Sequence, residues 1–346
     1  MTDLSYPELK KNHSLKAYNT LGVEARASRF ASIESEEQLT GFLAGPGQGG
    51  GDLFVLGGGS NVLFVGNYEG TVLHIAIEGI EVVREDTDHV WIRAGAGENW
   101  HRTVQYCVKQ GWGGIENLSL IPGTVGAAPI QNIGAYGVEL REVFDSLSAI
   151  HIESAEKRFF DRQACRFGYR DSIFKNELKG EYIITTVTLR LSKVPELNTS
   201  YGAIRSKLLE KGIDRPTVRD ISDVVIEIRN SKLPNPNDLG NAGSFFKNPM
   251  IKRERYEELK RRYPEIPGYP SEDGEQVKVP AGWLIEETGW KGKRVGNTGT
   301  YRQQALVIVN HGGATGAEIF QLAEQIRNSV RETFGIDLVP EVNIIG

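Results

Sequence analysis

The chain has 346 residues, enough for two or three domains with substantial hydrophobic cores. Its charged fraction is 25% and its net charge is −5, so the composition gives no indication of general affinity for nucleic acid or for an anionic membrane. No apolar stretch approaches the ~20 residues needed to span a bilayer, and the first residues lack the basic and apolar regions of a signal peptide. We therefore expect a soluble, cytoplasmic protein.

Short apolar runs bounded by glycine or charged residues predict β-strands. The predicted strands cover residues 53–56, 62–65, 71–76, 90–94 and 182–191. Apolar residues at helical spacing predict helices at 98–110, 218–229, 252–262 and 315–334. The last has a capping-box pattern at Thr315–Glu318 and ends at Gly335. Strands and helices do not alternate strictly, which indicates an α+β fold with several sheets.

Two segments resemble linkers or loop tips. Residues 45–51 are rich in glycine, and residues 231–240 contain two prolines among turn-forming residues. We expect a flexible tip at the first segment and a domain boundary at the second.

Gly57-Gly-Gly-Ser-Asn61 follows a predicted strand and could turn backbone N–H groups toward an anion, or could form only a tight turn. A dinucleotide-binding Rossmann loop requires a helix after its glycines, whereas residues 62–65 look like another strand.

A second segment, Ile121 to Gly137, is nearly uncharged and rich in glycine and alanine. It could lie flat against a large ligand, or could be a buried loop packed under a sheet. The Gln131 and Asn132 amides favour contact with a pyrophosphate or the edge of a ring.

Three further residues could take part in chemistry. Arg170, in Arg166-Phe-Gly-Tyr-Arg-Asp171, could grip a carboxylate or form a surface ion pair. Glu341 follows a proline and has apolar neighbours, a pattern that by itself fits an edge-strand charge. Ser244, in Asn241-Ala-Gly-Ser-Phe-Phe-Lys-Asn-Pro249, has no nearby histidine, so it is a poor hydrolase nucleophile. We expect a tight turn and two aromatic rings to shield it from water, where it could donate a proton.

The remaining polar residues give no sign of a metal site. The six histidines are not at metal-ligand spacing from one another, and Cys107 and Cys165 are far apart in the sequence. We expect neither a metal nor a disulfide framework.

Taken together, these segments resemble the UDP-N-acetylenolpyruvoylglucosamine reductases, flavoenzymes of bacterial peptidoglycan synthesis. The resemblance spans nearly the whole chain and includes 19–23, 57–64, 94–101, 121–137, 166–172, 241–249, 302–306 and 340–342. Ser200-Tyr-Gly202 and the charged insert at 253–269 resemble the subgroup in which a tyrosine loop covers the substrate.

The resemblance implies a pair of FAD-binding subdomains of the vanillyl-alcohol-oxidase type and a substrate-binding α+β domain. We place these at 1–70, 71–230 and 231–335, with 336–346 returning to the active site. It further implies noncovalent FAD, NADPH as hydride donor, a UDP-sugar enolpyruvyl ether as substrate, and a monomer. The implied FAD-binding residues are Gly57, Gly58, Gly59, Ser60, Asn61, Pro122, Gly123, Thr124, Gly126, Ala127, Gln131 and Asn132. The implied substrate-binding residues are Tyr169, Tyr201, Arg229, Lys232, Asn248, Tyr269, Lys291 and Gln304.

The implied catalytic residues are Arg170, Glu341 and Ser244. The first two would stabilise negative charge on the substrate carboxylate, and Ser244 would protonate the α-carbon. Two alternatives remain open at this point. A flavin oxidase of the same fold would be reoxidised rapidly by oxygen, and a nucleotide-binding module without activity would be colourless when purified.

Overall fold

The computed structural model describes residues 6–45 and 52–346, so most of the glycine-rich segment 45–51 lies outside the described residues. The chain forms two compact units. Unit 1 comprises the described residues of 1–13, 27–58 and 69–229, and unit 2 comprises 14–26, 59–68 and 230–346. The finer boundaries expected from the sequence stay a prediction.

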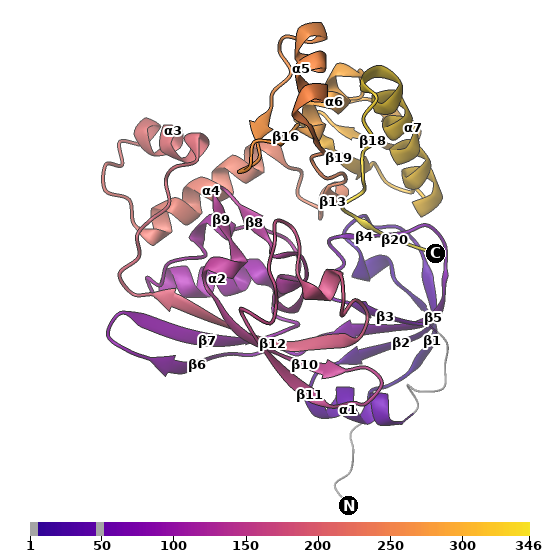
Figure 1. Ribbon diagram of the computed structural model, residues 1–346. Coiled ribbons are helices and arrows are strands. Elements are labelled where there is room, and N and C mark those ends of the chain that lie inside the picture. The colour runs from indigo at the N-terminus through magenta and orange to yellow at the C-terminus, as the bar shows by residue number, and fades with distance from the viewer. Residues whose placement is uncertain (1–5, 46–51) are drawn as a thin grey trace, which may run out of the picture. The chain divides into compact units, whose positions relative to one another are not determined.

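The core of unit 1 lies against a five-stranded antiparallel sheet in the order β11-β10-β12-β7-β6 (Figure 1). Its strands are β6 (Ile80–Glu85), β7 (His89–Gly95), β10 (Phe144–His151), β11 (Lys157–Asp161) and β12 (Tyr182–Ser192). Helix α2 (Trp100–Lys109) lies along one side of this sheet. Trp100, Val104 and Cys107 of the helix are buried in the same apolar cluster as the sheet residues, as the helical spacing predicts.

A second sheet has the order β1-β2-β5-β3. Its strands are β1 (Lys10–Ser14), β2 (Arg26–Ile33), β3 (Leu53–Leu56) and β5 (Tyr68–Ile75), and β3 pairs with β5 in parallel. The remaining elements of unit 1 include the hairpin β8 (Gly134–Ala135) and β9 (Val138–Glu139), and helices α1 (Glu36–Ala44), α3 (Gly202–Glu210) and α4 (Val218–Lys232), whose last residues belong to unit 2.

Unit 2 is built around the sheet β13-β19-β18-β17. Its strands are β13 (Gly240–Ser244), β17 (Arg294–Val295), β18 (Thr298–Tyr301) and β19 (Gln304–Asn310). A smaller sheet contains β14 (Met250–Lys252), β15 (Tyr269–Pro270) and β16 (Gln276–Lys278), and β4 (Val62–Phe64) pairs in parallel with β20 (Asn343–Ile345). The helices are α5 (Arg253–Arg262), α6 (Ala281–Glu287) and α7 (Gly316–Phe334).

Helix α7 forms as its sequence predicts. The hydroxyl of Thr315 accepts a bond from the Glu318 backbone, and the Glu318 carboxylate accepts from the Thr315 backbone at 2.7 Å. Gly335 ends the helix with φ 65°, a conformation that costs glycine little. The buried face of α7 supplies Ile319, Ile326 and Val330 to the core of unit 2.

The strands and helices predicted from periodicity are all present, with ends that shift by a few residues. Helices α1, α3 and α6 and strands β2, β10 and β11 were not predicted. These elements are short or have no clean apolar period. None of the described helices is long and apolar enough to cross a membrane.

Candidate active site

Two glycine-rich loops meet in unit 1. A methyl group added at Gly57 would lie 2.6 Å from the Thr124 hydroxyl, and one at Gly58 would lie 3.1 Å from the Gly123 Cα. Real Cβ atoms essentially never show a contact as short as 2.6 Å, and one of 3.1 Å is unusually tight, so both glycines favour the close approach of the loops. The two segments therefore pack closely against each other, and glycine-rich backbone of this kind can turn N–H groups toward a phosphate-bearing ligand.

The third glycine of the first loop belongs to unit 2 and is under a stronger constraint. Gly59 has φ 59°, and a Cβ there would lie 1.9 Å from the carbonyl oxygen of Tyr18. Its own carbonyl accepts from the Thr20 backbone N–H at 3.1 Å. The segment that follows, β4, is a strand, so this loop is not a Rossmann loop.

The Asn132 side chain makes its hydrogen bonds within the protein, and its predicted part in FAD binding stays a prediction. It is fully buried, with its Nδ2 donating to the Glu139 carboxylate and to the Gly168 carbonyl, at 3.0 and 2.9 Å. Its Oδ1 accepts from the Arg141 backbone at 3.0 Å. The side-chain amide therefore joins three neighbouring segments, and Asn132 itself has a left-handed backbone with φ 44°.

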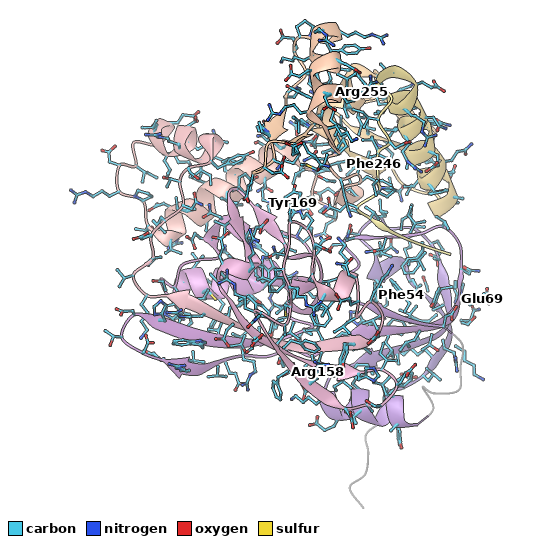
Figure 2. The ribbon with its side chains drawn as sticks, viewed as in Figure 1. Phe54, Glu69, Arg158, Tyr169, Phe246 and Arg255 are labelled. Atoms are coloured by element: carbon cyan, nitrogen blue, oxygen red, sulfur yellow. The ribbon has the colours of Figure 1, made fainter. Side chains whose placement is uncertain are left out.

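Arg170 lies at the tip of a small hairpin. The backbones of Gly168 and Asp171 bond to each other, which leaves Tyr169 and Arg170 as the turn. The hairpin is attached to the second glycine-rich segment by the Asn132–Gly168 bond and by the Ser172 hydroxyl, which donates to the Ile130 carbonyl at 2.7 Å. Tyr169 is 58% exposed and is labelled in Figure 2.

Arg229, near the end of α4, is a second cation of this region. Its Nε is buried and has no hydrogen-bond partner among the described residues, and no ion pair joins Arg229 to a carboxylate in that part of the chain. Burial lowers the pKa of Arg229, the Tyr136 hydroxyl opposes this through a hydrogen bond, and nearby Arg170 lowers it further. Two neighbouring arginines favour an anionic ligand.

His101 lies close enough to Arg229 to be affected electrostatically. Burial lowers the pKa of His101, and the Arg229 charge lowers it as well. Its Nδ1 accepts a bond from the Leu120 backbone at 3.0 Å, so a neutral His101 carries its hydrogen on Nε2. Neither His101 nor Tyr136 was among the predicted site residues. The sequence did contain a signal for Tyr136, because it is an aromatic residue before Gly137 in a segment made mostly of small residues.

Helix α4 carries Arg229 and fixes the position of its backbone. Ser222 lies seven residues earlier on the same helical face. Its hydroxyl forms a hydrogen bond with the Ser119 hydroxyl at 2.8 Å and accepts one from the Gln105 amide at 2.9 Å. The start of this face is therefore attached to the rest of unit 1.

Ser244 is exposed, which corrects the expectation that aromatic neighbours shield it from water. Phe245 and Phe246 are each 1% exposed and pack into the core of unit 2, where Figure 2 labels Phe246. The strand β13 is irregular between Asn241 and Ser244, and Gly243 has φ 69°. The core therefore takes both aromatic rings and leaves the hydroxyl at the surface.

Glu341 lies next to this segment in unit 2. Its backbone N–H donates to the Phe245 carbonyl at 2.8 Å, and its carbonyl accepts from the Asn61 Nδ2 at 3.2 Å. The Asn61 carbonyl in turn accepts from the Asn343 backbone. Three segments far apart in sequence thus meet here: the end of the first glycine loop, the Ser244 segment and the C-terminal segment.

Three of the predicted substrate-binding residues of unit 2 lie against helix α6. The Asn248 Oδ1 accepts from the Ala281 backbone at 2.9 Å, and the Gln304 side chain lies against Gly282, both at the start of the helix. Lys291 pairs with Glu286 in its last turn, at 2.7 Å. Tyr269 is exposed on β15, and Lys232 is exposed at the end of α4.

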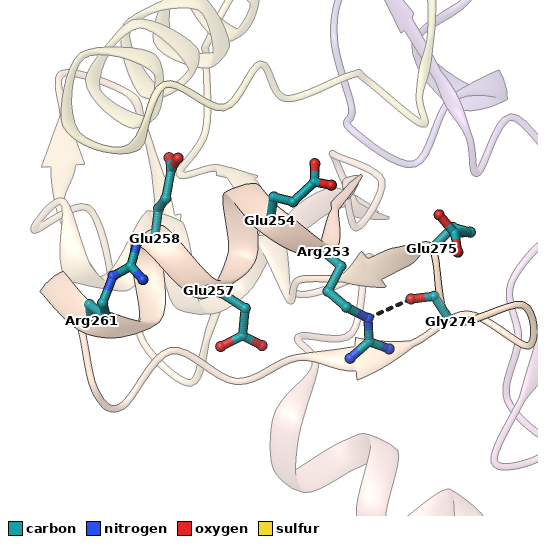
Figure 3. A pocket seen from close by; sticks show the side chains of 7 residues that line it. All are labelled: Arg253, Glu254, Glu257, Glu258, Arg261, Gly274 and Glu275. Carbon is teal, nitrogen blue, oxygen red and sulfur yellow. Dashed lines mark hydrogen bonds between the residues drawn. The ribbon is translucent and has the colours of Figure 1, made fainter.

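A cavity of about 550 Å³ lies elsewhere in unit 2 (Figure 3). It is bounded by α5 and by the turn at Gly274, whose carbonyl accepts from the Arg253 Nε. None of the predicted site residues lines it. Among the described residues, no three His, Cys, Asp or Glu side chains gather as metal ligands would.

The fold and its paired glycine loops are those of a flavin-dependent oxidoreductase. Residues 27–153 match the family described as FAD binding domain. Residues 235–345 match the C-terminal domain of UDP-N-acetylenolpyruvoylglucosamine reductase.

Relatives with that name match along the whole chain. The chain is 48% identical to the protein of Flavobacterium johnsoniae over 339 residues, covering 98% of this chain and 100% of the relative. It is 51% identical to that of Pseudomonas aeruginosa, covering 97% and 99%. The chain therefore belongs to the UDP-N-acetylenolpyruvoylglucosamine reductase family.

A solved structure has the same fold. The crystal structure of UDP-N-acetylenolpyruvylglucosamine reductase from Thermus caldophilus superposes with a TM-score of 0.68 at 24% identity, covering 98% of this chain and 99% of that one.

Proposed function

We propose that this protein reduces the enolpyruvyl group of UDP-N-acetylglucosamine enolpyruvate to UDP-N-acetylmuramate, with NADPH as the hydride donor and noncovalently bound FAD as the carrier. The product is a peptidoglycan precursor. The observation that carries the proposal is the pair Arg170 and Arg229, because Arg229 has no carboxylate partner in the described part of the chain and the substrate supplies one. Family membership supports the same substrate.

The residues of the two glycine loops fit FAD. Gly57, Gly58 and Gly123 leave the backbone uncovered, and Thr124 adds a hydroxyl beside them. FAD held there would supply the hydride-transfer chemistry between the nicotinamide and the terminal enolpyruvyl carbon. The protein's part is to bind both ligands, to stabilise charge and to supply a proton.

We assign charge stabilisation to Arg170. When the terminal carbon accepts a hydride, negative charge spreads into the substrate carboxylate and gives an enediolate-like species. A fixed guanidinium lowers the energy of that charge without having to reorganise during the step. The hairpin bonds at Gly168 and Ser172 would hold Arg170 in place.

We assign Ser244 as the proton donor to the α-carbon and Glu341 as the group that assists at the same stage. Serine is a weak acid, but a carbanionic α-carbon is a strong base. The bonds from Glu341 to the Phe245 backbone keep the two segments adjacent. Lys232, Lys291, Asn248, Tyr269 and Gln304 would then bind the nucleotide and diphosphate, since cationic and amide donors suit phosphate oxygens.

The test separates the two half-reactions by stopped-flow absorbance of the flavin. Arg170→Ala and Glu341→Gln should still be reduced by NADPH at a near-normal rate. Reoxidation by the enolpyruvyl substrate should slow on the order of 100- to 1000-fold, the usual effect of removing one preorganised donor.

A matched control is available two residues before the same hairpin. Arg166 is exposed and pairs with Glu177 at 2.5 Å, so Arg166→Ala should change neither half-reaction more than a few-fold. Slowing of flavin reduction alone would show that the assigned roles are wrong. Rapid reoxidation by oxygen, without any response to the substrate, would indicate an oxidase instead.

A further inference from the structure

Tyr136 occupies an unfavourable backbone position. It forms, with Gly137, the two-residue turn of the β8–β9 hairpin, where Ala135 pairs with Val138. Both turn residues have positive φ, 52° and 81°, as a type I′ turn requires. Glycine and asparagine adopt this conformation readily, whereas tyrosine does so at a cost of order 1 kcal/mol or more. A tyrosine retained here points to a use for its side chain.

The ring of Tyr136 packs against Tyr201. Their centroids are 5.1 Å apart at an interplanar angle of 86°, an edge-to-face contact. Tyr201 is the residue before α3, and its carbonyl accepts the bond from the Ile204 backbone in the first turn of that helix. The ring of Tyr136 therefore supports the start of α3.

The backbone around Tyr136 is attached to the same segment. The Asn117 amide donates to the Tyr136 carbonyl at 3.1 Å and to the Asn198 carbonyl at 3.0 Å. Asn198 in turn donates to the Gly137 carbonyl at 3.1 Å. The hairpin tip and the residues that lead into Tyr201 are thus tied together through three bonds.

The Tyr136 hydroxyl lies close enough to the Arg229 side chain for each group to shift the pKa of the other through a side-chain hydrogen bond. A guanidinium has no acceptor, so Arg229 donates and the phenol oxygen accepts. Burial raises the pKa of Tyr136, although Arg229 acts in the opposite direction, so the phenol stays neutral at physiological pH. The hydroxyl hydrogen of Tyr136 then points away from Arg229, and Tyr136 can donate it to a third group.

We propose that Tyr136 is a positioning residue of the substrate site: its hydroxyl orients the Arg229 guanidinium toward the substrate carboxylate while its ring supports Tyr201. The proposal rests on the proposed function and adds a residue to it. An arginine has several rotatable bonds, and a buried one that lacks a carboxylate partner needs another group to restrict them. Tyr136 supplies that restriction from a hairpin that is itself fixed by Asn117.

The first experiment removes only the hydroxyl. Tyr136→Phe should bind UDP-N-acetylglucosamine enolpyruvate about tenfold more weakly, since a hydrogen bond to a charged group is lost. Binding is measured through the absorbance change of the oxidised flavin, so no turnover is required. UDP-N-acetylglucosamine, which lacks the carboxylate, should bind to the variant as it does to the unmodified protein.

The control is Tyr182→Phe, which removes a hydroxyl from another part of unit 1, where it bonds to Arg158 at 3.4 Å. It should bind both ligands normally. Both variants should retain flavin and melt within a few degrees of the unmodified protein. Equal weakening for the two ligands, or no weakening for either, would overturn the proposed role of Tyr136.

A double-mutant cycle tests whether Tyr136 acts through Arg229. Arg229→Gln alone should weaken binding of the enolpyruvyl substrate, and adding Tyr136→Phe should weaken it no further. Losses that multiply would mean that Tyr136 acts independently, which contradicts the proposal. If the unmodified protein itself failed to bind this substrate, the proposed function would be wrong, and this inference with it. If it bound the substrate but the variants did not behave as expected, only the role of Tyr136 would be wrong.

Discussion

At the scale of single residues, the surroundings of Ser244 are poorly suited to nucleophilic attack. No histidine lies within a dozen residues of it in the sequence, and the residues after it are buried in the core. Irregular pairing of β13 leaves its hydroxyl exposed beside the segment that carries Glu341. An exposed hydroxyl is accessible to a substrate, and excluding water from it would then depend on the bound ligands.

Ser244→Ala should abolish turnover while leaving folding, FAD binding and flavin reduction by NADPH near normal, because it removes the proton donor without adding bulk or charge. Ser244→Cys should recover part of the activity, since a thiol can also donate a proton. In deuterated water, the product should carry solvent deuterium at the α-carbon, which NMR of the product would detect.

The control for this prediction is Ser329→Ala on α7, where the hydroxyl accepts from the Trp290 indole at 3.0 Å. It should affect stability more than rate. Turnover by Ser244→Ala within a few-fold of the unmodified enzyme would show that Ser244 has only a structural role.

At the scale of elements, the first glycine loop connects strands that belong to different units, and its glycines are required for two different reasons. Gly57 and Gly58 allow the second loop to approach, whereas Gly59 needs a positive φ and lies against the Tyr18 carbonyl. The Asn61 amide then holds the Glu341 backbone. A change in this loop should therefore affect the second glycine-rich segment and the C-terminal segment together.

Gly59→Ala should destabilise the protein by about 1–3 kcal/mol through backbone strain alone, with more from the clash with Tyr18. Thermal unfolding followed by circular dichroism should show a lower melting temperature, and the purified variant should retain less flavin. Gly66→Ala is the matched control, because Gly66 has open space around it and no positive φ. Similar melting temperatures for both variants would contradict this account of the loop.

At the scale of the whole molecule, the chemistry of the cysteines argues against a thiol-linked cofactor. Cys107 and Cys165 are buried, and burial raises the pKa of each thiol to about 12. The thiolate is the reactive form, so neither cysteine is poised to attack a flavin. Both instead pack as small apolar side chains in the core of unit 1.

Acid or heat precipitation of the purified protein should therefore release a yellow supernatant with the absorption spectrum of free FAD. Removal of FAD should lower the melting temperature, because a ligand that binds only the folded state stabilises it, and added FAD should restore the original value. Colour that stays with the precipitated protein would indicate covalent attachment instead.

Much of the fold could be predicted because its signals are local. The capping box and terminal glycine of α7 lie within the helix that they delimit, and a strand after Gly57–Asn61 excluded a Rossmann loop. Helix α6 was missed because it is short and has two glutamates in its last turn. Periodicity needs several turns to be visible.

The sequence by itself determined the family, the α+β class and the residues that carry polar chemistry, because these depend on residue types at short spacing. Only the tertiary structure decided which of those residues meet. Tyr136, Arg170, Tyr201 and Arg229 come from four separate segments, yet contacts or electrostatic interactions join each of them to another. The Asn132 amide bonds within the protein, because buried polar groups need hydrogen-bond partners. Ser244 is exposed, because the large aromatic rings that follow it occupy the core.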